Sequence, residues 1–576
     1  MKVKTLPLLA SLIWAVIGLL VLTACSQKKH PPQPAASAPP DLVAHNAEFQ
    51  KEVIEVTPGI FVAVGYGLAN SILIEGTDGV TIVDAMESAE AAIPVKEAFA
   101  QITSKPVKAM VYTHFHSDHI GGGRIMAGQD HPEVYCHAET LTHLFRTAGI
   151  TRETTYRRAM RQFCTMLPRD QLINAGIGPL LEFDQNTTLA MLMPTITFSG
   201  EQLEIEAAGV KMVLMHAPGE TPDQIIVWLP EKKVLLPADD FYHSFPNLYA
   251  IRGTAYRDVM LWVASLDKMR ALGAQYLVPQ HTRPIEGAAR IMETLTNYRD
   301  AIQFVHDQTV RNINLGLTPE VIVERVKLPA HLAAQPYLQE YYGTVAWSVR
   351  AIFDGYLGWF GGNATDLFPL SPKERAQHMA VLAGGEKQLL DQAQKALAAD
   401  DHQWALELAD HLLQLSPSLP EARQIRAKSL RALGEKQVTA TALNYYLTQA
   451  LETQGDIVIG MMKNPDRQTL QQIPLSAFFA GMAVKLNPVK SAEVDLVAGF
   501  RFPDTAETYA VHVRRGVAEI STRFPAAPDI ELTVESIIWK EMVTGLRNPA
   551  VALAKDVQKE GGVLKIVNFL NLFKGE

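Results

Sequence analysis

Cysteine is scarce in this chain, with three among 576 residues. So low a number excludes a disulfide-rich secreted scaffold, and Cys25, Cys136 and Cys164 have no spacing typical of a zinc or thiol redox motif. Long apolar runs are missing after the first 24 residues, which leaves no later candidate for a membrane-spanning helix. Positive charge is not in excess, since the formal net charge is −9. We therefore expect no nucleic acid as a partner.

The N-terminus has the features of a secretory signal. Lys2 and Lys4 precede an apolar run over 6–22, which ends in Leu-Thr-Ala and Cys25. This ending resembles the lipobox of bacterial lipoproteins, and Ser26 resembles the sorting pattern for the outer membrane. The resemblance implies a lipidated Cys25 and a periplasm-facing location in the bacterial cell envelope, in the outer membrane. An uncleaved signal anchor with an incidental cysteine remains the alternative.

The remaining chain is too long for a single hydrophobic core. Short strands alternate with helical stretches over 53–290, which is an α/β pattern. The pattern is helical over 298–451, where 404–415 and 420–433 predict one helical hairpin, and it is mixed over 455–576. We divide the chain into a signal peptide with lipobox (1–25), a proline-rich tether (26–50), an α/β catalytic domain (51–295), a helical domain (296–450) and a mixed α+β domain (451–576).

A dense group of metal-ligand residues follows the predicted strand 107–112. His114, His116, Asp118 and His119 lie within six residues, at the C-terminal end of that strand. On a tight turn this spacing directs the first two side chains one way and the last two the other. Imidazoles and carboxylates are zinc ligands, so two diverging sets predict two metal ions a short distance apart.

Further ligand candidates follow three later predicted strands. Glu220 comes after 211–216, Asp239 after 234–237, and His281 after 276–279. Asp240 is a weaker rival to Asp239. Asp84, at the end of another predicted strand, is a candidate for orienting a histidine ligand from behind.

The motif from His114 to His119 is the HxHxDH motif, and here the chain resembles the metallo-β-lactamase superfamily. That resemblance implies an αββα sandwich with two Zn²⁺ per chain. Glu220 stands where most of the superfamily has the histidine of a PGHT turn, which resembles the alkylsulfatase branch. The segment 298–360 is similar to the helical dimerisation domain of that branch. The segment 502–517 is similar to its C-terminal sterol-carrier-type domain.

The resemblance implies a role for each candidate residue. One metal takes His114, His116 and Glu220; the other takes Asp118, His119 and His281; Asp239 bridges them, where the branch usually has glutamate. Asn247 and Arg252 correspond to the asparagine and arginine that hold the sulfate. The implied activity is zinc-dependent cleavage of amphiphilic alkyl sulfate esters to alcohol and sulfate by a metal-bound hydroxide, in a homodimer.

Two other functions stay open. One is a different hydrolase of the same fold, acting on a phosphoester, a thioester or a lactam or lactone. The other is a non-catalytic lipid-binding envelope lipoprotein that retains the metal site as a relic. The apolar residues of 478–570 form either a core, which is favoured, or a groove for the tail of an alkyl sulfate. His243 is either near the site or structural, and Tyr256 is a weak candidate for a general acid. Cys136 and Cys164 either pair or remain free, with free thiols favoured.

Replacing Cys25 by serine (Cys25→Ser) is expected to abolish acylation and leave the precursor unprocessed or soluble, because the thiol accepts the lipid. Incorporation of a labelled fatty acid and partition into membranes measure this. If the variant partitions into membranes as the wild type does, the segment is an uncleaved anchor.

Overall fold

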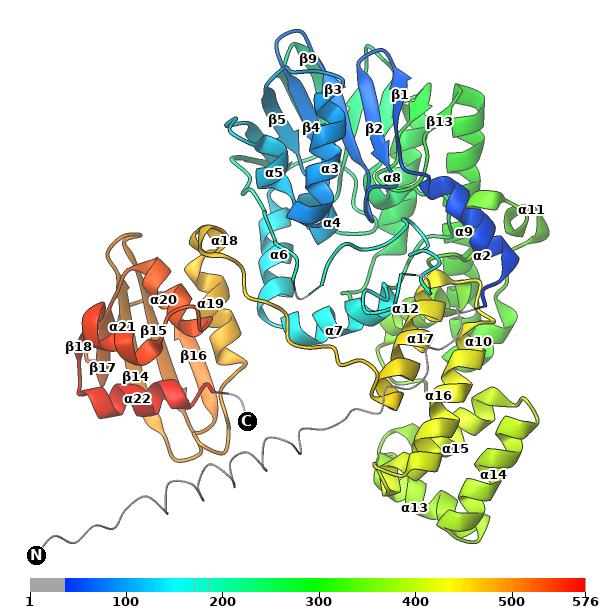
Figure 1. Cartoon of the computed structure of the whole chain (residues 1–576), viewed down its shortest axis with the longest axis vertical. Helices are drawn as coiled ribbons and strands as arrows, with labels where there is room; N and C mark the ends of the chain where they lie inside the picture. The colour runs from blue at the N-terminus through cyan, green and yellow to red at the C-terminus, as the bar shows by residue number, and fades with distance from the viewer. Residues whose placement is uncertain (1–36, 170, 185, 575–576) are drawn as a thin grey trace, which may run out of the picture.

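The computed structural model describes residues 37–574, apart from 170 and 185. Three parts follow one another along the chain: an α/β part, a helical part and a C-terminal α+β part (Figure 1). The signal segment and Cys25 lie outside the described residues. Among the helices within the described ranges, none combines the length and apolar content needed to cross a membrane.

The first sheet has seven strands in sequential order. Strands β1 to β4 pair antiparallel, and β4 to β7 pair parallel. The strands are β1 Glu52–Thr57, β2 Ile60–Val64, β3 Ser71–Glu75, β4 Val80–Val83, β5 Val107–Val111, β6 Glu133–His137 and β7 Ile196–Phe198.

The second sheet has six strands in the order β13-β12-β11-β10-β9-β8. Among the described residues of this sheet, β11 and β12 pair parallel and all other neighbouring strands pair antiparallel. The strands are β8 Gln202–Ala207, β9 Val210–His216, β10 Ile225–Leu229, β11 Val234–Leu236, β12 Tyr276–Leu277 and β13 Ile285–Glu286. The predicted strands that precede the candidate ligands are thereby confirmed, with small differences at their ends.

The two sheets pack face to face around one apolar core. Ile72 and Val111 of the first sheet share this core with Leu214 and Val227 of the second. Helices α3 (Ala89–Ala100) and α5 (Gly123–Ala127) pack on the outer face of the first sheet, and α8 (Val259–Ala271) and α9 (Ala288–Asn314) on that of the second (Figure 1). This arrangement confirms the predicted αββα sandwich.

The strand directions bring the candidate ligands to one edge. Strands β9 and β11 both pair antiparallel with β10, and β12 is parallel to β11, so all three end at the same edge of the second sheet. Strand β5 of the first sheet leads into α4 (Ser117–Ile120), which carries two of the candidates. Residues far apart in sequence therefore meet where these strands end.

Two glycines let α4 and α5 lie directly against the segment after β4. A Cβ atom at Gly121 would lie 2.1 Å from the carbonyl oxygen of Glu87, and one at Gly122 would lie 2.3 Å from that of Ala85. No side chain fits in such a space. The glycines after HxHxDH are therefore required by close packing behind the site.

The helical part lies where the sequence predicted it. The predicted hairpin is confirmed as α15 and α16, and it belongs to a stack of five consecutive helices that share an apolar core with their neighbours. The helices are α10 Pro319–Arg325, α11 Ala330–Ala333, α12 Val345–Leu357, α13 Pro372–Ala383, α14 Glu386–Ala398, α15 His402–Leu415, α16 Pro420–Gly434 and α17 Ala440–Gln454.

The C-terminal part is a five-stranded sheet, in the order β16-β15-β14-β17-β18, with helices packed on it. Phe479, Phe500, Phe502, Trp539 and Phe569 are buried together in its core, so these aromatic residues do not line an open groove. The elements are α18 Arg467–Gln472, α19 Leu475–Ala483, β14 Asp495–Phe502, β15 Glu507–Arg514, β16 Val517–Ser521, β17 Ile530–Thr533, α20 Ser536–Val543, α21 Pro549–Lys555, β18 Gln558–Glu560 and α22 Val563–Asn571.

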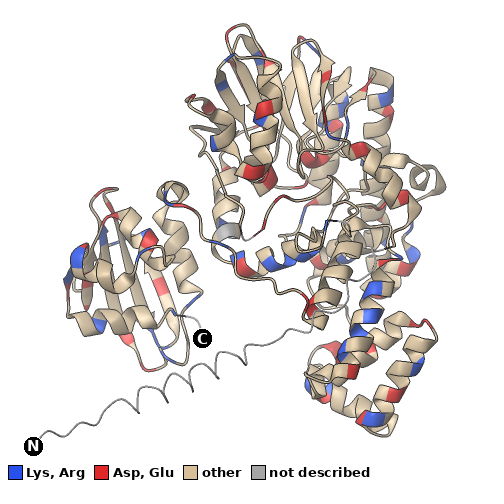
Figure 2. Ribbon diagram, in the orientation of Figure 1, with Lys and Arg blue, Asp and Glu red and all other residues tan. Residues whose placement is uncertain are grey.

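Polar contacts join the parts. The guanidinium of Arg161 on α7 (Arg152–Gln162) donates to both carboxylate oxygens of Glu452 on α17, at 2.7 and 3.0 Å. Arg124 donates to Asp466 at 2.8 Å, next to the C-terminal part. Basic and acidic residues are interspersed over the ribbon, and α7 carries several of the arginines (Figure 2).

Candidate metal centre and anion site

Seven buried or half-buried side chains converge at the edge between the sheets, and they are the seven that the sequence predicted as ligands. Their donor atoms form three overlapping groups, each with all its atoms within 4.8 Å of one another. The groups are His114, His119 and Asp239; Asp118, His119 and His281; and His116, Glu220 and Asp239.

Asp239 lies at the centre of this cluster. Its Oδ2 atom is 3.1 Å from Nε2 of His281, 3.5 Å from Nε2 of His119 and 3.7 Å from Nε2 of His114. Asp240 points elsewhere, because its Oδ1 atom accepts a hydrogen bond from the backbone N–H of Glu220 at 3.2 Å. The geometry thus puts Asp239 between the two sets of ligands and Asp240 behind one of them.

The chemistry of the cluster fits metal cations. Nε2 of His119, Oε2 of Glu220 and Oδ1 of Asp239 are buried without a hydrogen-bond partner among the described residues. Leaving such groups unpaired is costly. Imidazole nitrogens and carboxylate oxygens are also the donors that zinc takes in proteins. Divalent cations at this place would satisfy all three atoms.

Contacts behind two of the histidines set their orientation. Nδ1 of His119 is 2.8 Å from Oδ2 of Asp84, and Nδ1 of His281 is 2.8 Å from the carbonyl oxygen of Leu68. With Nδ1 as the donor, each ring presents the Nε2 lone pair to the cluster. Asp84 thereby lies where the sequence analysis expected it. Burial lowers the pKa of His114 to about 3, so this ring is neutral and able to bind a metal.

Backbone strain accumulates around the same residues. Asp84, Ala238 and Thr282 have positive φ angles of 60°, 52° and 65°, which non-glycine residues rarely adopt. Ala238 precedes Asp239, and Thr282 follows His281. Conformations of this kind cost on the order of 1–3 kcal/mol each and are typical of functional sites.

Two arginines lie against the candidate ligands, Arg252 half-buried and Arg257 buried. Nη2 of Arg252 is 3.1 Å from Nε2 of His116, and Nη1 of Arg257 is 2.8 Å from Oε1 of Glu220. Nη1 of Arg252 and both Nε and Nη2 of Arg257 are buried with no acceptor among the described residues. Unsatisfied guanidinium donors beside a metal-type cluster are suited to an anion with several oxygens.

Sequence reasoning missed Arg257. The sequence predicted the anion site within 247–253. Arg257 lies five residues after Arg252, next to Asp258, which is the N-cap of α8. Its Nη1 atom donates to the carbonyl oxygen of Asn247 at 2.5 Å, so the predicted sulfate-binding asparagine also holds this second arginine. Nothing in the local pattern distinguishes Arg257 from a surface arginine, because its burial depends on distant segments.

The weaker candidates lie elsewhere. Nδ1 of His243 pairs with Oε2 of Glu48 at 3.0 Å, which favours a structural role. The ring of Tyr256 packs against Gly355 of α12 and is partly exposed. Cys136 and Cys164 are buried free thiols in the described structure.

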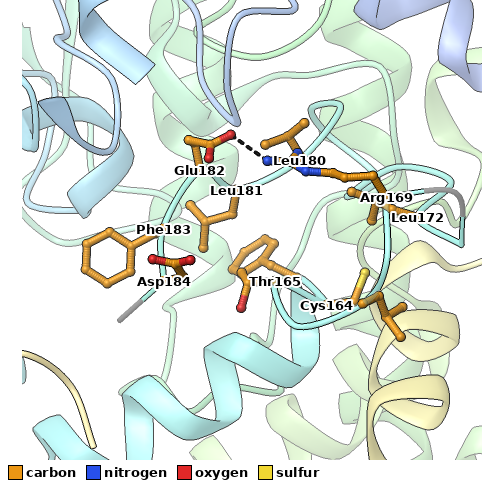
Figure 3. Close-up of a pocket in the computed structure, with 11 residues that line it drawn as sticks. Cys164, Thr165, Arg169, Leu172, Leu180, Leu181, Glu182, Phe183 and Asp184 are labelled. Carbon is orange, nitrogen blue, oxygen red and sulfur yellow. Dashed lines mark hydrogen bonds and ion pairs between the residues drawn. The ribbon is translucent and has the colours of Figure 1, made fainter. Parts of the chain in front are cut away.

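The ring of Phe163 lies next to Arg252, with 5.9 Å between the guanidinium and the ring centroid. Phe163 also lines a small pocket of mixed polar and apolar residues. Leu180, Leu181 and Phe183 lie on the chain segment that faces Cys164 and Thr165 across this pocket (Figure 3). An anion held by Arg252 would therefore have one aromatic ring near it.

The αββα sandwich and the ligand cluster define a hydrolase of the metallo-β-lactamase type, and comparison with protein families agrees. Residues 64–281 match the metallo-beta-lactamase superfamily. Residues 318–456 match the family described as alkyl sulfatase dimerisation, and residues 463–575 match alkyl sulfatase C-terminal.

Relatives that cover most of the chain place it in one family within this superfamily. A linear primary-alkylsulfatase of Pseudomonas is 37% identical over 525 residues, covering 88% of this chain and 98% of that protein. The alkyl/aryl-sulfatase BDS1 of Saccharomyces cerevisiae is 27% identical and covers 90% and 82%. An (R)-specific secondary-alkylsulfatase of Pseudomonas is 28% identical and covers 81% and 72%. The chain belongs to the alkylsulfatase family.

A solved structure has the same fold over the whole length. The stereoselective inverting sec-alkylsulfatase Pisa1 of Pseudomonas superimposes with a TM-score of 0.84 at 24% identity, covering 98% of this chain and 97% of that one. The order of the three parts is thus that of an alkylsulfatase.

Proposed function

We propose that this protein is a zinc-dependent alkylsulfatase that hydrolyses alkyl sulfate esters to alcohol and sulfate. The main support is the set of buried guanidinium donors of Arg252 and Arg257 without acceptors among the described residues, beside a cluster of metal ligands. A sulfate ester has several oxygens that accept such donors and keeps one negative charge. The names of the relatives, linear primary- and secondary-alkylsulfatase, agree with this substrate class.

The ligand set suits two zinc ions. His114, His116 and Glu220 would hold one ion, and Asp118, His119 and His281 the other, with Asp239 between them. The three carboxylates offset three of the four positive charges, so the site tolerates one more anionic ligand. Zinc lowers the pKa of water bound to it to about 7 and so supplies a nucleophile near neutral pH.

Side chains of the protein would bind the substrate and stabilise the charge that develops on it. Arg252 and Arg257 bind the sulfate oxygens and stabilise the negative charge that grows as the ester bond breaks. The ring of Phe163, 5.9 Å from the guanidinium of Arg252, would contact the first part of the alkyl chain. An amphiphilic substrate suits this arrangement, because its anionic end would meet the arginines and its apolar part the aromatic ring.

Elemental analysis of the purified protein is expected to give about two zinc ions per chain. His116→Ala combined with Asp118→Ala removes one ligand from each set and should lower the content to well below one per chain. His402→Ala, on α15 and outside the cluster, serves as the control. Wild-type metal content in the double variant contradicts the assignment.

Arg252→Ala is expected to lower alkyl sulfate turnover on the order of 10²-fold, because a charged donor to the developing charge is lost in a buried site. Arg252→Lys should recover part of the rate, since it restores the charge without the planar geometry. The metal content should not change. The measurement is initial rates on alkyl sulfates and on a neutral ester, with Arg514→Ala as the control.

Arg514 is suited to this control because it lies on β15 of the C-terminal part, partly exposed and paired with Glu519 at 2.7 Å. If sulfate turnover in Arg252→Ala stays within a few-fold of the wild type, the proposed anion site is wrong.

We also propose a homodimer formed through the helical part, which matches the dimerisation family. Large apolar side chains are exposed there: Phe368 is 96% exposed and Leu382 81%, and Trp359 is also exposed. Exposed apolar groups of this size, close together in sequence, are typical of protein–protein contacts.

Light scattering of a soluble form that begins after Cys25 is expected to show a dimer at micromolar concentration. Phe368→Glu with Leu382→Glu should shift it to the monomer, because charges would be buried in the contact. Val489→Glu changes a side chain of similar exposure, 83%, in the C-terminal part and should leave the dimer intact. A wild-type monomer, or a double variant that dimerises normally, contradicts the proposal.

A further inference from the structure

A buried carboxyl group outside the ligand cluster holds two loops of the site. Glu87 is fully buried, immediately before Ser88, the N-cap of α3. Its Oε1 atom accepts a hydrogen bond from the backbone N–H of Leu68 at 3.1 Å and another from that of Glu182 at 2.8 Å. One side-chain oxygen thus joins segments that lie 19 and 95 residues away in sequence.

The first of these segments reaches a candidate ligand directly. The carbonyl oxygen of Leu68 accepts the hydrogen bond from Nδ1 of His281 at 2.8 Å. Glu87 therefore holds the N–H of Leu68, and the C=O of the same residue holds His281, so the two contacts are joined through the backbone of Leu68. The next residues clamp the same turn, since Nδ2 of Asn70 donates to the carbonyl oxygens of Pro279 and Thr282.

The carboxyl group of Glu87 fits closely against the backbone at Gly67, where no side chain could be placed. A Cβ atom at Gly67 would lie 2.6 Å from its Oε2 and 2.7 Å from its Oε1. Oε2 has no hydrogen-bond partner among the described residues. Burial raises the pKa of Glu87 to about 7, in keeping with a group that serves as a hydrogen-bond acceptor rather than as a surface charge.

We propose that Glu87 is a positioning residue that orients His281 through the backbone N–H and C=O of Leu68. It thereby sets the affinity for the metal ion held by Asp118, His119 and His281. This inference rests on the proposed metal centre. Without Oε1, the N–H of Leu68 is left buried and unpaired, the turn relaxes, and the His281 ring loses its fixed orientation. Loss of a partner behind a metal ligand typically weakens metal binding about 10–100-fold.

Three variants of Glu87 test separately its role as a hydrogen-bond acceptor, its negative charge and the volume of its side chain. Glu87→Gln keeps an oxygen that can accept both hydrogen bonds. Glu87→Ala removes it, and Glu87→Leu removes it but fills the space with apolar atoms. Ser88→Ala is the matched control: its Oγ atom caps α3 and donates to the carbonyl oxygen of Glu182 at 2.9 Å, but no bond from it to Leu68 is recorded among the described residues.

Zinc titration of the metal-free proteins against a competing chelator measures both binding steps. We expect at least tenfold weaker binding at one of the two steps in Glu87→Ala and Glu87→Leu, and changes within threefold in Glu87→Gln and Ser88→Ala. Added zinc should restore turnover in the two weakened variants, which a purely structural defect would not allow. Thermal unfolding identifies any loss of fold.

The outcomes distinguish this inference from the proposed function. If the wild type binds no zinc, the metal centre itself is wrong. If the wild type binds two ions and Glu87→Leu does so with equal affinity, Glu87 does not position His281. Loss of affinity in Glu87→Gln as severe as in Glu87→Ala would also overturn the inference, as would a failure of both Ala and Leu variants to fold while Ser88→Ala folds.

Discussion

The structure depends on the burial of three carboxylates among four imidazoles at the edge of the two sheets. Asp239 lies within 3.1–3.7 Å of three histidine rings, and several facing atoms have no protein partner among the described residues. Burying such groups is costly unless cations bind to them. The edge is therefore organised for metal binding, and strain at Asp84, Ala238 and Thr282 is tolerated to achieve it.

Rigid contacts behind the site keep the ligands in place. The two sheets share one core, while Gly121 and Gly122 bring α4 and α5 directly against the segment after β4. That segment carries Asp84, which contacts His119, and Glu87, which contacts Leu68 behind His281. Ligands from both sheets are thus oriented by one short stretch of chain, which explains why the site needs the sandwich and not just the motif.

The helical part supports the segment that carries Arg252. Helix α7 connects that segment with the helical part. Gln162 of α7 accepts a hydrogen bond from the backbone N–H of Arg252 at 3.0 Å, and Arg161 of α7 pairs with Glu452 of α17. The arginines that face the metal ligands therefore belong to a surface supported by the helical part. This arrangement links the proposed dimer to the place where an anionic ester would bind.

The sequence alone predicted which seven side chains would cluster and the order of the domains. Residues two to five apart on one turn diverge in a way that backbone geometry dictates, and Glu220, Asp239 and His281 each follow a recognisable strand. Only the tertiary structure decided that Asp239 rather than Asp240 faces the cluster, that Arg257 is buried beside Glu220, and that Glu87 contacts Leu68 behind His281. It also decided how the helices predicted over 298–451 stack on one another. Burial and partners from distant segments decide these features, and no local pattern encodes them.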